Sequence, residues 1–412
     1  MSPGEKIDHS DLIYDWNRDS EILPKGTLVE FDDETLRDGL QSPSVTTPTL
    51  ETKIRILHLM NDLGLHTADI GLPGAGPHVL EDVIALAKEI RDQKLNIRAN
   101  CAGRTVIADI EPIAKASQEV GLPIEACLFI GSSEIRRVTE DWNLDQMLRH
   151  TEESVRFAVE RDLPVMCVTE DTARARPETI RQIYTVAIES GAKRICVCDT
   201  VGHSTPNGVK HLIEFVASVV RDSGEDVGID WHGHNDRGLG LINTLAALEA
   251  GAQRLHGTAI GIGERCGNTA MDQLLVNLKL MGVIDNDLSS LPAYCDEVSR
   301  AVSIPIPSNY PAIGSDAFET GTGVHAAAVI KAIQKGDHWL ADRVYSGVPA
   351  ADLGREQSIR VGPMSGRSNV IFWLQKHGQP TDDGTVDRIF QAAKESKRLL
   401  TDEEIRTVLA RG

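Results

Sequence analysis

The feature that most constrains the fold of this chain is a pattern that occurs eight times along it. In each unit a short apolar, β-branched run precedes a turn and then an amphipathic segment of roughly a dozen residues. Such alternation predicts parallel strands, and eight units favour a closed (β/α)8 TIM barrel, although a doubly wound open sheet would give similar local patterns. The predicted strands are residues 28–33, 67–71, 96–101, 124–131, 164–169, 194–199, 228–232 and 254–260.

The pattern changes after about Met281, where a predicted helix over residues 291–302 leads into the proline-rich connector 304–311. The rest reads as mostly helical, and its last helix is expected to begin at Thr401, which opens a capping-box pattern. We therefore predict a TIM-barrel catalytic domain over residues 1–282. A linker and a helical C-terminal subdomain are expected over residues 283–412.

The charge of the chain argues against several classes of partner. With 42 basic and 61 acidic residues, its formal net charge is −19, which would repel nucleic acid and anionic membrane surfaces. No stretch has the roughly 18 apolar residues of a membrane span, and residues 1–20 lack the apolar core of a signal peptide. The seven cysteines are an odd number and lie mostly in apolar runs, which favours a reducing cytoplasm.

Two motifs at the ends of the first and seventh predicted strands suggest a metal site. Residues 33–39 read DETLRDG, and residues 232–236 read HGHND. Residues i and i+2 of a strand point to one face, so His232 and His234 can both reach one divalent cation. Asp38 would add an oxygen ligand, and Arg37 would place an electrophile beside the metal. An isolated His-x-His is more often a hydrogen-bonded or surface pair, and Arg37 is equally compatible with a structural salt bridge.

A third polar motif, GIGERCGN at residues 261–268, follows the eighth predicted strand. Three such clusters at strand ends indicate one active site, because a barrel assembles its site at the carboxyl ends of its strands. The glycines do not have the position of a dinucleotide-binding loop, and more plausibly allow a phosphate or thioester chain to approach backbone N–H groups. Cys196 and Cys198 share one strand face, for which core packing is the favoured interpretation.

Together, DETLRDGLQ at 33–41, HGHND and GERCGN resemble the metal-dependent family of 2-isopropylmalate, homocitrate and citramalate synthases and 3-hydroxy-3-methylglutaryl-CoA lyase, over nearly the whole chain. The resemblance implies that Asp38, His232 and His234 ligate a divalent metal and that Asn268 lies at or near a fourth protein position. It also implies that Arg37 holds the keto oxygen of a 2-oxo acid. The ligand set suits Mg, Mn or Zn.

The second region resembles the helical subdomain of the synthases, since a lyase of this family would stop soon after the barrel. By similarity His325 and Tyr345 belong to the catalytic apparatus and reach the barrel mouth of the partner subunit in a swapped homodimer. SGRS at 365–368 is similar to another synthase signature. Because the chain ends at Gly412, the leucine-regulatory domain of longer synthases is not expected.

The implied reaction joins acetyl-CoA to a 2-oxo acid, and thioester hydrolysis makes it irreversible. The base that deprotonates the acetyl group is expected to be His325 assisted by Tyr345, with Glu170 as the alternative. The default product is 2-isopropylmalate. Homocitrate-, citramalate- or citrate-type condensation and hydroxyacyl-CoA cleavage are the alternatives, and a non-catalytic metal-binding barrel is a third hypothesis.

The expected substrate contacts include departures from the family pattern. Asp69 stands where a glutamate is usual, Arg136 replaces a histidine after strand four, and Met166 replaces the substrate-binding arginine of homocitrate synthases. Arg136 could favour a second substrate carboxylate, whereas Met166 argues against 2-oxoglutarate. Thr320 replaces the usual first histidine of the subdomain motif. The predicted substrate-binding residues are Arg37, Gln41, Asp69, Arg136 and Thr200, the last of which could instead cap a turn.

Overall fold

In the computed structural model, eight parallel strands close into a barrel in which each strand pairs with its neighbours in sequence and β1 pairs with β8. The structure describes residues 8–10, 12–17 and 28–411, so parts of the predicted domains at 1–7, 11, 18–27 and 412 lie outside the described residues. The predicted closed barrel is confirmed. Its strands are β1 Glu30–Asp33, β2 Thr67–Asp69, β3 Arg98–Arg104, β4 Ile124–Gly131, β5 Val165–Glu170, β6 Arg194–Asp199, β7 Gly228–Gly233 and β8 Arg254–Gly257.

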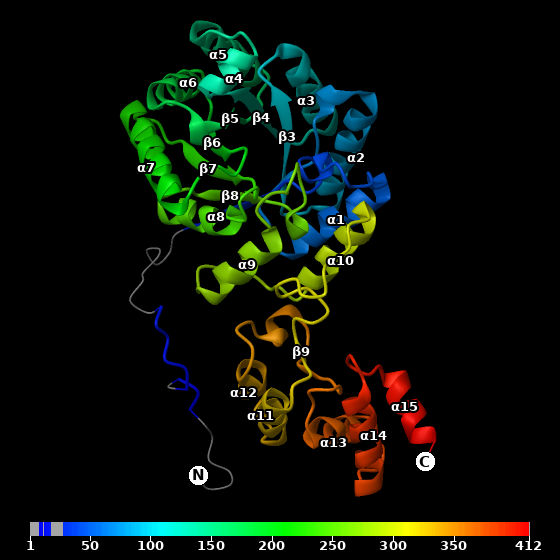
Figure 1. Ribbon diagram of the computed structural model, residues 1–412. Coiled ribbons are helices and arrows are strands. Elements are labelled where there is room, and N and C mark those ends of the chain that lie inside the picture. The colour runs from blue at the N-terminus through cyan, green and yellow to red at the C-terminus, as the bar shows by residue number, and fades with distance from the viewer. Residues whose placement is uncertain (1–7, 11, 18–27, 412) are drawn as a thin grey trace.

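Helices connect successive strands and surround the barrel (Figure 1). Most begin at a side-chain cap or a proline in the first turn, as α1 does at Thr49, whose hydroxyl accepts a hydrogen bond from the Thr52 N–H. The barrel helices are α1 Leu50–Asp62, α2 Pro77–Gln93, α3 Ile107–Val120, α4 Glu134–Thr139, α5 Leu144–Val159, α6 Pro177–Glu189, α7 Pro206–Ser223, α8 Gly240–Glu249 and α9 Met271–Leu280.

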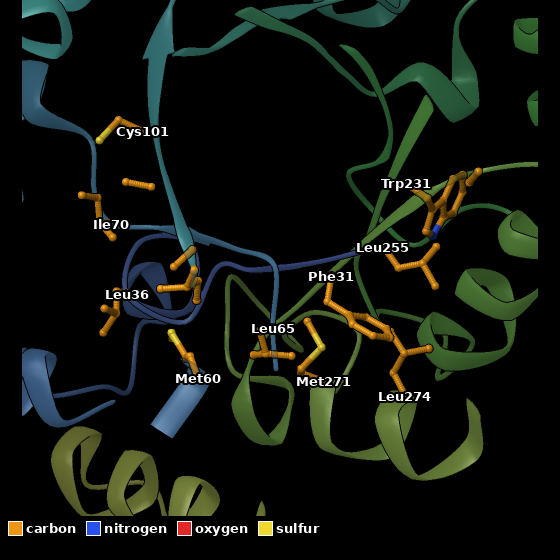
Figure 2. Packing of buried hydrophobic residues seen from close by; sticks show 14 of the residues in the cluster. Phe31, Leu36, Met60, Leu65, Ile70, Cys101, Trp231, Leu255, Met271 and Leu274 are labelled. Carbon is orange, nitrogen blue, oxygen red and sulfur yellow. The ribbon is translucent and has the colours of Figure 1, made fainter. Parts of the chain in front are cut away.

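The strand side chains alternate between two environments. Phe31 of β1, Trp231 of β7 and Leu255 of β8 point away from the centre of the strand ring and pack against the surrounding helices (Figure 2). The residues on either side of them, such as Asp32, Asp230 and His256, therefore face the inside of the barrel. Apolar burial between strands and helices thus leaves a polar interior in this half of the barrel.

The region after the barrel is mainly helical, as expected. Its elements are α10 Leu291–Val302, β9 Glu319–Thr320, α11 Gly323–Gln334, α12 His338–Arg343, β10 Ser358–Ile359, α13 Arg367–Lys376, α14 Asp383–Glu395 and α15 Asp402–Ala410. In Figure 1, α11–α15 lie beyond α9 and α10. The main hydrophobic cluster continues from the barrel through α10 as far as Leu353, whereas α13–α15 enclose a separate cluster. The domain boundary at 282/283 stays a prediction.

Candidate metal and substrate site

A cavity of about 210 Å³ lies inside the barrel, and its wall brings together eight of the predicted site residues. Residues from the ends of β1, β2, β5, β6 and β7 border it, as expected where strand ends assemble a site. The predicted residues on the wall are Arg37, Asp38, Gln41, Asp69, Glu170, Thr200, His232 and His234; the others are Glu34, Leu72, Ala102, Cys127, Phe129, Met166, Val168, Cys196, Cys198, His256 and Glu264.

Three of these residues form a buried group of potential metal ligands. The Nε2 atoms of His232 and His234 are 3.1 Å apart, and Nε2 of His234 is 3.8 Å from Oδ2 of Asp38. One donor atom from each of the three residues lies within 4.8 Å of the other two. Two imidazole nitrogens and one carboxylate oxygen, all turned to one point, are a donor set that a divalent transition metal accepts.

Asn268 is held beside this group by the loop after β8. It pairs with His234 in an isolated β-bridge, and its side-chain amide donates to Oδ2 of Asp38. Gly267 before it has φ +89°, and a Cβ there would lie 1.8 Å from the Gly261 carbonyl oxygen, so only glycine fits. Oδ1 of Asn268 and Nδ1 of His234 are buried without a hydrogen-bond partner. An unpartnered amide oxygen beside the three donors fits the expected fourth ligand position.

Arg37 is held by three carboxylates at once. Its guanidinium donates to Asp69 at 2.6 Å, to Asp38 at 2.9 Å and to Glu34 at 3.1 Å. Burial opposes the charge on Arg37, but Asp69, Asp38 and Glu34 outweigh it and raise the Arg37 pKa further above its ordinary value. Both interpretations of this arginine therefore have support, because it is an ion-pair partner that also borders the cavity.

Behind the candidate ligands runs a buried chain of polar contacts that sequence reasoning missed. Nδ1 of His232 lies 2.7 Å from Glu34, whose other oxygen lies 3.1 Å from Nδ1 of His256. Nε2 of His256 in turn lies 2.9 Å from Asp230, which also accepts from Arg254 at 2.5 Å. The sequence did contain a sign of this chain, because a titratable residue stands at every second position of β7 and β8, between apolar residues and glycines.

Glu34 has the position of a residue that orients a metal ligand. A carboxylate on the far ring nitrogen fixes the imidazole tautomer and aims Nε2 at the metal. Burial disfavours protonation of His232, but the neighbouring Glu34 charge prevails and raises the His232 pKa. Glu34, His232 and His256 also lie close enough to form a second group of potential ligands, although their facing atoms are already joined as hydrogen-bond partners.

The predicted substrate contacts divide into two sets. Gln41, Asp69 and Thr200 border the cavity, and the Thr200 hydroxyl accepts a 2.8 Å hydrogen bond from the Asp171 N–H. Arg136 is not among the residues of the wall; its guanidinium lies 3.2 Å from Glu140 and 3.5 Å from Glu170. Glu170 does border the cavity, and burial raises its pKa despite Arg136 beside it.

His325 and Tyr345 come together at a distance from this cavity wall. Their rings stack with centroids 4.0 Å apart, and both residues are exposed on the C-terminal region. Neither borders the cavity of its own barrel. Cys196 and Cys198, in contrast, are buried on the wall, with their sulfur atoms 3.8 Å apart.

Known proteins resemble the chain over most of its length. A family model described as HMGL-like matches residues 28–298. A probable 2-isopropylmalate synthase of Methanopyrus kandleri is 31% identical over 89% of this chain and 69% of its own. The homocitrate synthase AksA of the same organism is 30% identical over 90% of this chain and 88% of its own.

Solved structures show the same fold. The HMG-CoA lyase of Bacillus subtilis superposes with a TM-score of 0.58 and 23% identity, covering 70% of this chain and 98% of that one. None of the helices in the described part of the chain is both long and apolar enough to span a membrane.

Proposed function

The chain belongs to the HMGL-like family, and from this premise we propose that it is an acyltransferase condensing acetyl-CoA with a 2-oxo acid. The proposal is carried by the grouping of Arg37 with Asp38, His232 and His234 on one cavity wall. The relatives at about 30% identity are named as synthases, which supports condensation. The proposed product is a 2-alkylmalate, with 2-isopropylmalate as the best candidate; other 2-oxo acids of homocitrate- or citramalate-type reactions are the alternatives.

We propose that Asp38, His232, His234 and Asn268 hold a divalent ion, with Mg, Mn and Zn as candidates. Such an ion, when bound, would supply a Lewis acid and a template for the two oxygens of the oxo acid. Glu34 keeps His232 in the orientation that this role needs, through its 2.7 Å contact with Nδ1.

Arg37 is proposed to bind the keto oxygen of the oxo acid. As the acetyl group attacks, negative charge grows on that oxygen, and a fixed guanidinium stabilises it more strongly than it stabilises the ground state. The ion pairs to Asp69, Asp38 and Glu34 keep the guanidinium in place, so little reorganisation is needed at the moment of reaction. Gln41, Asp69 and Thr200 are the proposed further contacts.

The base that deprotonates the acetyl group is proposed to be His325 with Tyr345, acting on the barrel of a second subunit. Their stacking and exposure, and their absence from the wall of their own cavity, support a role in trans within a swapped homodimer. Glu170 is the alternative, because it borders the cavity with a pKa raised by burial. A cytoplasmic location completes the proposal, supported by the seven cysteines, all of which are free thiols.

An oxo-acid panel tests the proposed activity. The protein is loaded with Mn²⁺ and incubated with acetyl-CoA and each of several 2-oxo acids, and free CoA thiol is measured. We expect thiol release that depends on one or more acids and is abolished by a chelator. Absence of release with every acid would contradict the proposal, as would cleavage of hydroxymethylglutaryl-CoA to acetyl-CoA in place of condensation.

A further inference from the structure

One part of the cavity wall is apolar and rich in sulfur. Five side chains on it form a hydrophobic cluster of their own, separate from the main core of the barrel. They come from alternate positions of three adjacent strands, so they point inward together. This apolar floor consists of Cys127 of β4, Met166 and Val168 of β5, and Cys196 and Cys198 of β6.

The apolar floor and the candidate metal ligands occupy different arcs of the cavity wall. The ligand group comes from the ends of β1 and β7 and the loop after β8, whereas the floor comes from β4–β6. The two arcs meet at the β6–β7 pair, where Cys198 is in register with His232. A small molecule that fills the cavity would therefore meet charged groups at one end and thiols and a thioether at the other. At about 210 Å³, the cavity accommodates a compact metabolite.

The charges around the cavity disfavour a second anionic group at the floor. Arg37 is the one arginine on the wall in the described part of the chain, no lysine borders it, and three carboxylates already engage Arg37. Five acidic side chains share that wall, namely Glu34, Asp38, Asp69, Glu170 and Glu264.

Three other arginines near the wall are already engaged by carboxylates. Arg136 lies 3.2 Å from Glu140 and 3.5 Å from Glu170, which is itself on the wall. Arg254 lies 3.2 Å from the sulfur of Met166 but is held by Asp230 and Glu125. Arg265 donates to Asp236 and to the Thr200 carbonyl. A substrate carboxylate placed against the floor would lose its water without gaining a free cation, which is strongly unfavourable.

We propose that the apolar floor holds the side chain of the 2-oxo acid, so that the substrate is a monocarboxylic acid with an apolar side chain, and that Met166 sets the permitted size. This inference rests on the proposed condensation for its assignment of the two ends of the cavity. A thioether and thiols are adaptable packing partners, so the floor selects by size and polarity and not by hydrogen bonding.

Matched pairs of 2-oxo acids test whether the apolar floor excludes a second carboxylate. The pair 4-methyl-2-oxopentanoate and oxaloacetate, and the pair 5-methyl-2-oxohexanoate and 2-oxoglutarate, each differ by an isopropyl group in place of a carboxylate. We expect the apolar member to have the higher kcat/KM by about 100-fold or more, since a buried unpaired charge costs more than the one-methylene discriminations of roughly 10- to 200-fold. A dicarboxylate that is used as well as its apolar partner would overturn the inference.

Binding separates this inference from the proposed reaction. Calorimetric titration of the Mn²⁺-loaded protein with the same four acids needs no turnover. If no acid releases CoA but the apolar members bind more tightly, the proposed function fails and the assignment of the floor stands. If CoA is released and the dicarboxylates bind equally well, the function stands and the floor assignment fails.

Variants test the role of Met166. Met166→Ala should enlarge the floor and shift the kcat/KM ratio of 5-methyl-2-oxohexanoate to 2-oxobutanoate upward by about 10-fold. Met60→Ala is the matched control, because Met60 is equally buried but belongs to the main core on α1. Both variants should lose stability, but only the first should change the ratio.

A second variant makes the space at the floor smaller instead of larger. It keeps the inference testable if Met166→Ala fails to fold. Cys127→Val adds one heavy atom to the floor and should shift the same ratio downward. If both floor variants keep the wild-type ratio, as Met60→Ala is expected to do, the floor does not determine specificity.

Discussion

At the scale of single residues, Arg37 combines a position on the cavity wall with hydrogen bonds to three carboxylates. Three buried carboxylates hold its guanidinium, so the side chain arrives at the cavity already oriented. Removing it would leave Glu34, Asp38 and Asp69 without their shared cation. Its proposed role in stabilising charge and its structural role are therefore coupled, and a test must separate them.

We expect Arg37→Ala to lower kcat by a factor on the order of 10² to 10³, the usual cost of one lost donor to a developing oxyanion. Steady-state kinetics of CoA release measure this effect, and thermal unfolding reports the structural part. Arg55→Ala serves as the control, because Arg55 is also an ion-paired arginine but lies outside the cavity, beside Glu51 and Glu297. Equal losses of activity in the two variants would remove Arg37 from the mechanism.

Glu34→Gln tests the orientation of His232. The amide keeps the shape of the side chain but loses the charge that holds the far nitrogens of His232 and His256. Changes in such supporting groups typically weaken metal binding by about 10- to 100-fold, and we expect that range for the dissociation constant of Mn²⁺. Isothermal titration measures it directly. Glu30→Gln, the same change at the start of β1 and outside the cavity wall, should leave the affinity unchanged; equal effects would contradict the assignment.

The sequence was more informative about the candidate ligands, which lie in recognisable motifs, than about the residues that support those ligands. Asp38, His232 and His234 stood out because they follow strand ends, and the structure places them in one group. Glu34 lay inside a quoted motif but received no role. His256 and Asp230 lie at alternate positions of β7 and β8, but which groups they contact depends on which strands become neighbours in the barrel.

At the scale of elements, the strands with continuous apolar runs were predicted best. The bounds of β4 and β6 match the prediction, whereas β1 begins two residues late and β8 ends three residues early. Pairing between β1 and β8 starts at Glu30 and Arg254, so Leu28 lies outside the sheet and is 86% exposed. The strand β8 stops because residues Ala259–Gly261 turn, with φ of Ile260 at +47°. The apolar character of a short stretch cannot show where β1 begins or where β8 ends.

A titratable carboxylate on α9 is hydrogen-bonded to the loop after β8. The Asp272 carboxylate accepts a 2.7 Å hydrogen bond from the Ile260 N–H, close to the loop that presents Asn268. Burial raises the Asp272 pKa from 3.8 to about 6, although that hydrogen bond acts in the opposite direction. The folded state therefore binds this proton more tightly than the unfolded chain does.

The sign of the resulting pH dependence follows from linkage. The contribution of Asp272 to stability is fully present below pH 3.8 and is lost as the pH rises to about 6. Asp272→Asn cannot titrate but keeps an acceptor for Ile260. We therefore expect the variant to gain stability relative to the wild type between about pH 4 and pH 6, measured as Tm across that window. A difference in Tm that stays constant across the window would contradict the raised pKa, and Asp296→Asn on the exposed side of α10 provides the control.

At the scale of the whole molecule, the chain separates a site-bearing barrel from a helical region with its own packing. The cluster of α13–α15 is separate from the main core, which ends at Leu353. In the region after the barrel, Val324 of α11 is 76% exposed, Met364 before α13 is 72% exposed, and Tyr345 after α12 is 49% exposed. The Met364 carbonyl accepts from the Gly323 N–H, which places these apolar side chains near His325. A surface of this composition is typical of an interface.

The proposed swapped homodimer predicts complementation between two inactive variants. Arg37→Ala disables the barrel, and His325→Ala removes the proposed base. If the partner's His325 serves each barrel, a mixed dimer contains one site with both residues intact, so an equilibrated equal mixture should recover about a quarter of wild-type activity. If His325 serves its own barrel, or if Glu170 is the base, the mixture should gain nothing over its parts. Mixing without subunit exchange is the necessary control, and size-exclusion chromatography establishes that dimers form. Recovery therefore requires both the trans arrangement and a catalytic His325, so this one experiment tests both parts of the proposal.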